Sequence, residues 1–110
     1  MDYVTADLWS PNRPAMPIGK RPWLVLHEGH GIVLLSPNTL ELVRLSVEQY
    51  EQLGADPEPF NPLRVAERLR ANRHFAEKYG YITTGGVALL CALEQLDGLI
   101  AAEQQLALAA

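Results

Sequence analysis

The amino-acid sequence predicts an α+β fold, in which a three- to four-stranded antiparallel β-meander packs against two or three helices, the longest at the C-terminus. Three observations predict it. Three apolar runs separated by turn residues lie between positions 23 and 45, helix start signals occur near positions 46 and 61, and an apolar helical stripe occupies the last quarter of the chain. With 110 residues, 48% of them hydrophobic, the chain is long enough for the core of one small domain, residues 1–110.

The first 22 residues are expected to form an edge strand followed by a proline-rich arm. Apolar and polar residues alternate from Tyr3 to Leu8, which is the pattern of a half-buried strand. Four prolines follow between Pro11 and Pro22, and because they lack backbone donors this segment does not fit inside a sheet. The arm is either a surface loop or a semi-rigid segment that contacts a partner, and Arg13 is its candidate partner-binding residue.

Residues 23–45 carry the strongest β-strand pattern. The apolar runs Trp23–Leu26 and Ile32–Leu35 flank a glycine-containing turn, and a third strand is expected over Thr39–Leu45 after a Pro-Asn turn. The middle run has no polar position, so it should be covered on both faces of the sheet. The third strand carries one acidic and one basic residue, which predicts a less buried place for it.

Two helices are predicted after the meander. Ser46 and Gln49 have the spacing of a capping box, so a short helix over residues 46–53 should end at the following glycine. After a linker, Asn61-Pro62 combines a capping residue with proline at the first helical position, which predicts a helix over residues 62–78. One side of that helix carries a narrow apolar stripe interrupted by one amide: Val65, Leu69, Asn72 and Ala76.

Residues 84–110 are predicted to form the longest helix. An apolar stripe follows one side of it: Leu89, Leu93, Leu96 and Ile100. At about 1.5–3 kcal/mol for each buried side chain, covering this stripe contributes roughly 6–12 kcal/mol. The first two turns are apolar all round, and the stripe is longer than a small sheet covers. We therefore expect these four residues to mediate self-association, most simply as a two-fold homodimer.

Charge is unevenly distributed along the chain, whose net charge is -4. The helix over residues 62–78 contains five basic residues against two glutamates, and its Arg64 and Arg68 lie on one side. Glu67 is placed to pair with Arg70, three residues later. The basic side is a solvated face, a contact for an acidic protein surface, or a nucleic-acid recognition helix, and the overall negative charge argues against the last.

The sequence contains no catalytic motif, so it predicts no catalytic residue and no cofactor. His27-Glu28-Gly29-His30 places two histidines three residues apart in a turn, whereas the zinc motif of metalloproteases needs histidines four apart on a helix. A metal-binding protein or an enzyme centred on His27 and His30 stays an alternative, because a hairpin turn can bring two imidazoles and a carboxylate together. The single cysteine, Cys91, is expected to be a small buried apolar residue.

The absence of a catalytic motif favours a binding function. We expect a non-enzymatic protein that binds another protein and acts as a small oligomer: an adaptor, an inhibitor or an assembly component of phage or bacterial origin. Its candidate partner-binding residues are Arg13, Trp23, Arg64 and Arg68. The alternative partner is a nucleic acid, bound by a regulator that uses the helix over residues 62–78. No secretory signal or membrane-spanning run is recognised, so a cytoplasmic location is expected.

Overall fold

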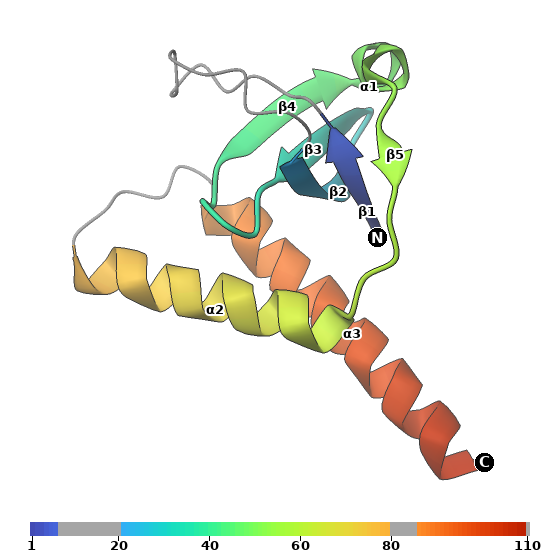
Figure 1. Ribbon diagram of the computed structural model, residues 1–110, viewed down its shortest axis with the longest axis vertical. Coiled ribbons are helices and arrows are strands. Elements are labelled where there is room, and N and C mark those ends of the chain that lie inside the picture. The colour runs from blue at the N-terminus through green and yellow to red at the C-terminus, as the bar shows by residue number, and fades with distance from the viewer. Residues whose placement is uncertain (7–20, 80–85, 110) are drawn as a thin grey trace.

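The computed structural model describes residues 1–6, 21–79 and 86–109. Within these ranges, five strands form one antiparallel sheet in the order β4-β3-β2-β1-β5, and three helices accompany it (Figure 1). In chain order the elements are β1 (Asp2–Ala6), β2 (Arg21–Glu28), β3 (Gly31–Leu35), β4 (Leu42–Ser46), α1 (Val47–Leu53), β5 (Asp56–Pro57), α2 (Pro62–Lys78) and α3 (Gly86–Ala109). The predicted α+β fold, with its longest helix at the C-terminus, is confirmed.

The centre of the sheet is the predicted meander. β2, β3 and β4 pair antiparallel in sequence order, and the register Glu28↔Gly31 leaves a two-residue turn between β2 and β3. Gly29 in this turn has a φ of 58°, a left-handed conformation that glycine adopts without a steric penalty. The middle strand is covered on both faces as predicted, since every residue of Ile32–Leu35 is at most 4% exposed.

β1 is not the edge strand that the sequence suggested. It pairs with β2 along its full length and with β5 on its other side, at Val4↔Pro57 and Thr5↔Asp56. β5 lies in the segment that was predicted as a linker, and its proline is accommodated because it sits at the edge of the sheet. The pairing joins residues far apart in the sequence, which no local pattern predicts.

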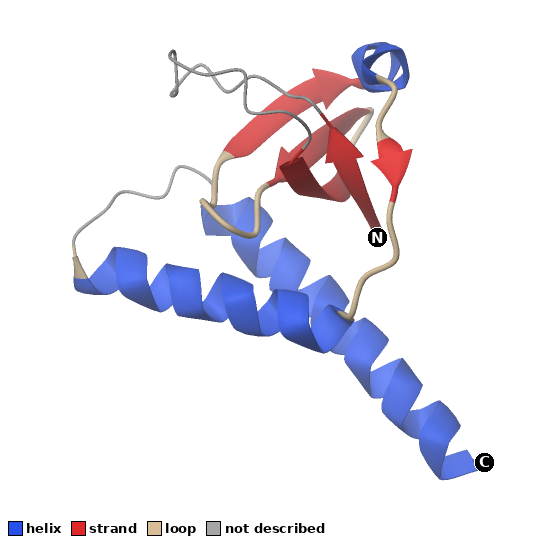
Figure 2. Cartoon of the chain, in the orientation of Figure 1, coloured by secondary structure: helices blue, strands red, loops and turns tan. Residues whose placement is uncertain are grey.

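The sheet separates two apolar clusters. The strands contribute Leu24, Leu26, Val33 and Leu35 to the cluster that α2 and α3 cover. They contribute Val4, Ala6, Trp23, Val25, Ile32 and Leu34 to the cluster on the other face, against which α1 packs. Alternate residues of β2 and β3 therefore enter different clusters, which explains the continuous apolar runs in both strands. Figure 2 shows α2 and α3 together on one side of the sheet.

Both predicted helix starts are present. The Ser46 hydroxyl accepts from the Gln49 backbone N–H at 3.1 Å, and the Gln49 side chain accepts from the Ser46 N–H at 2.9 Å, which completes a capping box. The Asn61 side chain accepts from two backbone amides in the first turn of α2. The Asn61 cap fixes where α2 begins along the chain. The preceding residue, Phe60, contacts Tyr3 of β1, so the beginning of α2 lies near the N-terminal strand and the candidate site.

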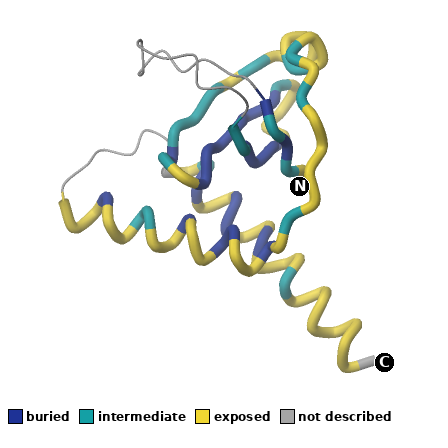
Figure 3. The backbone as a smooth tube through the Cα atoms, viewed as in Figure 1, coloured by how far each residue is buried: buried dark blue, intermediate teal, exposed yellow. Residues whose placement is uncertain are grey.

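α3 has a first half with one buried side and a second half that is exposed (Figure 3). Leu89, Leu93 and Leu96 are at most 7% exposed, in the cluster that α3 shares with the sheet and α2. After the half-buried Ile100, every residue to Leu108 is exposed, and this end of the helix extends away from the sheet (Figures 1 and 3). Two to three turns of helix thus lack a neighbour among the described residues.

Some predictions concern residues outside the described ranges. Arg13 and most of the proline-rich arm belong to residues 7–20, and the first two residues of the predicted last helix, 84 and 85, belong to residues 80–85. The predicted arm and the start of the last helix therefore stay predictions.

Candidate partner-binding site

The basic residues of α2 differ in what surrounds them. Arg70 donates from Nη2 to both carboxylate oxygens of Asp97 on α3, at 2.7 and 2.8 Å. Arg73 Nε lies 3.1 Å from Glu77 Oε1, one turn along α2. The predicted pairing of Arg70 with Glu67 is wrong, because Arg70 reaches across to the neighbouring helix instead. Two of the basic charges are thus compensated within the protein.

Arg64 and Arg68 have no carboxylate partner within the part of the chain that the structure describes. Arg68 donates from Nη1 to the Asn38 side-chain oxygen at 2.8 Å, a neutral acceptor that leaves the guanidinium charge uncompensated. Arg64 is in the first turn of α2, which contains no acidic residue although the helix dipole favours anions there. An incoming anion would therefore be stabilised by two guanidinium groups and by the positive end of the helix.

These two arginines line a cleft of about 230 Å³, which we call the Arg64/Arg68 cleft. Its remaining walls come from β1, the loop before β4, the loop before α2 and α2 itself: Tyr3, Pro37, Pro59, Phe60 and Val65. The rings of Tyr3 and Phe60 are in contact, with their centroids 5.5 Å apart. The cleft joins cationic groups to a proline and aromatic surface, a composition suited to a peptide with an acidic residue.

The loop before β4 is held in place beneath the cleft. Asn72 of α2 donates from Nδ2 to the backbone oxygens of Pro37 and Asn38, at 2.6 and 3.2 Å. Leu40 in the same loop has a φ of 62°, a left-handed conformation that is unfavourable for leucine, and its buried side chain joins the core. The buried Leu40 side chain and the two hydrogen bonds from Asn72 hold this loop, which also carries Asn38.

Tyr3 brings a hydroxyl group to the same cleft. Burial raises the pKa of Tyr3 above its ordinary value of 10.0, while the charge of Arg68 lowers it and that of Glu58 raises it. The hydroxyl is therefore protonated at neutral pH and is available as a hydrogen-bond donor. Within the described residues this hydroxyl makes no hydrogen bond, although the Tyr3 carbonyl accepts from the Glu58 backbone N–H at 2.8 Å.

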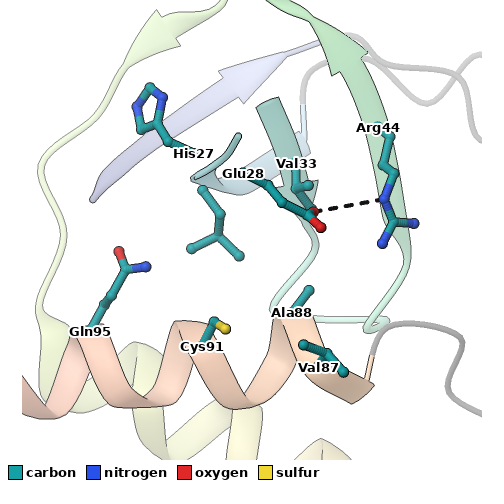
Figure 4. Close-up of a pocket in the computed structure, with 9 residues that line it drawn as sticks. His27, Glu28, Val33, Arg44, Val87, Ala88, Cys91 and Gln95 are labelled. Carbon is teal, nitrogen blue, oxygen red and sulfur yellow. Dashed lines mark ion pairs between the residues drawn. The ribbon is translucent and has the colours of Figure 1, made fainter. Parts of the chain in front are cut away.

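A second cleft, of about 150 Å³, lies between the sheet and the first half of α3. Figure 4 shows Ala88, Cys91 and Gln95 projecting from α3 toward the sheet, with Glu28 and Arg44 on the opposite side. Cys91 is exposed, which corrects the prediction that it is buried, because it lies outside the stripe that packs on the core. Arg44 Nε is 3.8 Å from Glu28 Oε2, so the cation of this cleft already has an anionic neighbour.

The other candidate residues are placed differently from Arg64 and Arg68. Trp23 is fully buried in the core and presents no surface to a partner, because β2 directs it into the cluster beneath α1. His27 and His30 are exposed at the hairpin between β2 and β3, and no group of three metal-ligating residues occurs among the described residues. Three of the four residues expected at a subunit contact are covered within one chain: Leu89, Leu93 and Leu96.

The cleft was only partly predictable from the sequence. The helical wheel placed Arg64 and Arg68 together, but Tyr3, Phe60 and Asn38 come from three other segments and gave no local signal. No family model, curated protein or solved structure matches the chain. Within the described residues, no helix has the length and apolar character needed to cross a membrane.

Proposed function

We propose that this protein binds another protein through the Arg64/Arg68 cleft and has no catalytic role of its own. The observation that carries the proposal is the uncompensated charge of Arg64 and Arg68 beside an aromatic and proline surface. Exposed cations with no carboxylate partner among the described residues favour an external anion, and the apolar walls add contact area that a free ion would not use. An adaptor, an inhibitor or an assembly component would each use such a surface.

An acidic protein segment suits the cleft better than a nucleic acid. Arg70 and Arg73 are engaged by Asp97 and Glu77, so α2 does not offer the row of free cations that a phosphate backbone requires. The net charge of -4 adds a repulsive field for a polyanion. A short protein segment with one or two carboxylates can bind Arg64 and Arg68, which lack a carboxylate partner among the described residues. It experiences less of the repulsion than a long polyanion does.

Self-association through the exposed end of α3 is the second part of the proposal. The large apolar side chains exposed on this helix are Val87, Leu90, Leu99, Leu106 and Leu108. From residue 98 to residue 109 the only charged residue is Glu103. A charged partner would therefore find almost no opposite charges on this end of α3. A second copy of the same helix, packed about a two-fold axis, would cover the leucines with an equally uncharged surface.

Affinity capture with matched variants tests the proposed binding function. We expect a protein recovered from the native host with the wild-type chain to be lost with Arg64→Glu/Arg68→Glu. It should be retained with Arg73→Gln, which changes a basic residue of the same helix that is already paired. Recovery that is equal for all three chains would remove the Arg64/Arg68 cleft from the function. A salt-dependent gel shift with DNA or RNA that needs both arginines would favour the nucleic-acid alternative.

A further inference from the structure

We infer that the Arg64/Arg68 cleft recognises a single carboxylate next to an apolar side chain on an extended peptide, with the Tyr3 hydroxyl as a third donor. This inference rests on the proposed binding function and specifies its ligand. It is carried by the donors that line the cleft and by the walls beside them.

Three side chains that carry hydrogen-bond donors line the cleft. Arg64 has no partner within the described residues, Arg68 uses one nitrogen on Asn38 and keeps its other donors, and the Tyr3 hydroxyl is protonated. A carboxylate has two oxygens that accept several hydrogen bonds, so it can satisfy donors from more than one of these groups at once. Asn38 fixes Arg68 in advance, which lowers the entropy lost when the ligand binds.

The apolar walls of the cleft favour a ligand that has an apolar group beside its carboxylate. The tilted rings of Phe60 and Tyr3 are in contact, and Pro59 extends this apolar wall. Pro37 and Val65 also line the cleft, but their side chains are almost fully buried. An aliphatic or aromatic side chain on the residue next to the carboxylate would displace water from this surface. A free inorganic anion would leave it exposed, so the walls distinguish a peptide from a simple ion.

Glu58 adds a negative charge near the cleft, although it does not line it. Its backbone N–H donates to the Tyr3 carbonyl oxygen, and its carboxylate acts on the Tyr3 hydroxyl as a nearby negative charge. Two arginines and one glutamate leave one net positive charge around the cleft. A singly charged carboxylate neutralises that charge, but two arginines also attract a phosphate, so the apolar walls and not Glu58 favour a peptide over free phosphate.

An NMR titration with small probes tests the inference. The probes are N-acetyl-Leu-Glu-amide, N-acetyl-Leu-Gln-amide, N-acetyl-Gly-Glu-amide and inorganic phosphate, and the readouts are the Nε–Hε signals of Arg64 and Arg68 and the ring signals of Tyr3. We expect saturable shifts with the Leu-Glu probe at millimolar concentration, and at least about tenfold weaker binding of each of the other three probes. Tyr3→Phe, which keeps the aromatic ring, should lower the affinity for the Leu-Glu probe about tenfold. Arg73→Gln should leave the affinity for the Leu-Glu probe unchanged.

Several results would overturn the inference. Equal binding of the glutamine and glutamate probes would show that charge is not recognised, and tighter binding of phosphate would assign the cleft to a phosphorylated or nucleic-acid ligand. Full affinity in Tyr3→Phe would remove Tyr3 from recognition. No saturable shift would contradict the carboxylate ligand, but the capture of a partner that still depends on Arg64 and Arg68 would leave the binding function in place. Capture of a partner protein that does not depend on either arginine would contradict the proposed binding function.

Discussion

At the residue scale, Asn72 explains an irregularity in the sequence. It interrupts the apolar stripe of α2, yet its amide points at the loop before β4 and donates to two backbone oxygens there. The sequence identified its side of the helix correctly, since Val65, Leu69 and Ala76 are buried. It could not identify the partners of Asn72, because the loop that supplies them lies more than thirty positions earlier in the chain.

Replacing Asn72 should loosen this loop. We expect Asn72→Ala to lower the free energy of unfolding by about 1–3 kcal/mol, because the Pro37 and Asn38 carbonyls lose a donor in a partly buried place. Urea denaturation followed by circular dichroism measures the change. Gln104→Ala on the exposed end of α3 is the control and should change the free energy by less than about 0.5 kcal/mol. A loss for Asn72→Ala no larger than the control contradicts the anchoring role.

The tyrosines predict how stability depends on alkaline pH. Burial raises the pKa of both Tyr3 and Tyr50 above 10.0, so the charged phenolate is less favourable in the folded chain than in the unfolded chain. The resulting stabilisation is complete below pH 10 and is lost as the pH rises through the raised values. We expect the free energy of unfolding to fall more steeply above pH 10 in the wild-type chain than in Tyr3→Phe/Tyr50→Phe. Identical slopes would show that other groups cause the loss.

At the element scale, α3 combines two different environments in one continuous helix. Its periodicity correctly predicts that one stripe is buried, but the same pattern continues past the point where the sheet and α2 end. Periodicity reports which side of a helix is apolar and carries no information about where its neighbours stop. The sequence therefore assigned Leu89, Leu93 and Leu96 to a subunit contact, although they are covered within the chain.

Alanine substitutions in the two halves of α3 should have different effects on the free energy of unfolding. Leu96 is 0% exposed and Leu106 is 71% exposed. We expect Leu96→Ala to lower the free energy of unfolding by about 2–5 kcal/mol, because it leaves a cavity between the helix and the sheet. Leu106→Ala should change it by less than about 0.5 kcal/mol when measured at low protein concentration. Similar losses for the two variants would mean that the end of α3 is packed within a single chain.

The exposed end of α3 also predicts an effect on assembly. If two copies pack through it, Leu106→Glu/Leu108→Glu places charges in that contact and should shift the mass measured by sedimentation velocity from dimer toward monomer. Glu94→Gln, on an exposed position near the middle of the helix, should leave the mass unchanged. A wild-type chain that sediments as a monomer at high concentration would contradict the second part of the proposed function.

At the scale of the whole molecule, the cleft exists because distant segments converge. β5 pairs with β1 and brings the loop before α2 beside Tyr3, while Asn72 and Arg68 tie α2 to the loop before β4. The sequence predicted most of the elements involved, because strand runs and helix caps are local signals. It did not predict the cleft, because the cleft depends on contacts between residues that are 30 or more positions apart in the chain.

Site-specific photo-cross-linking tests the partner-binding role of the cleft most directly. A photoreactive phenylalanine analogue replaces Leu63, an exposed residue of α2 adjacent to Arg64, and the chain is irradiated in its native host. We expect a discrete adduct with another protein, which disappears when Arg64→Glu/Arg68→Glu is added and persists when Arg73→Gln is added. The same analogue at Glu51 on α1 should give no such adduct. An adduct that survives reversal of both arginines, or one that forms equally from Glu51, would contradict binding at the cleft.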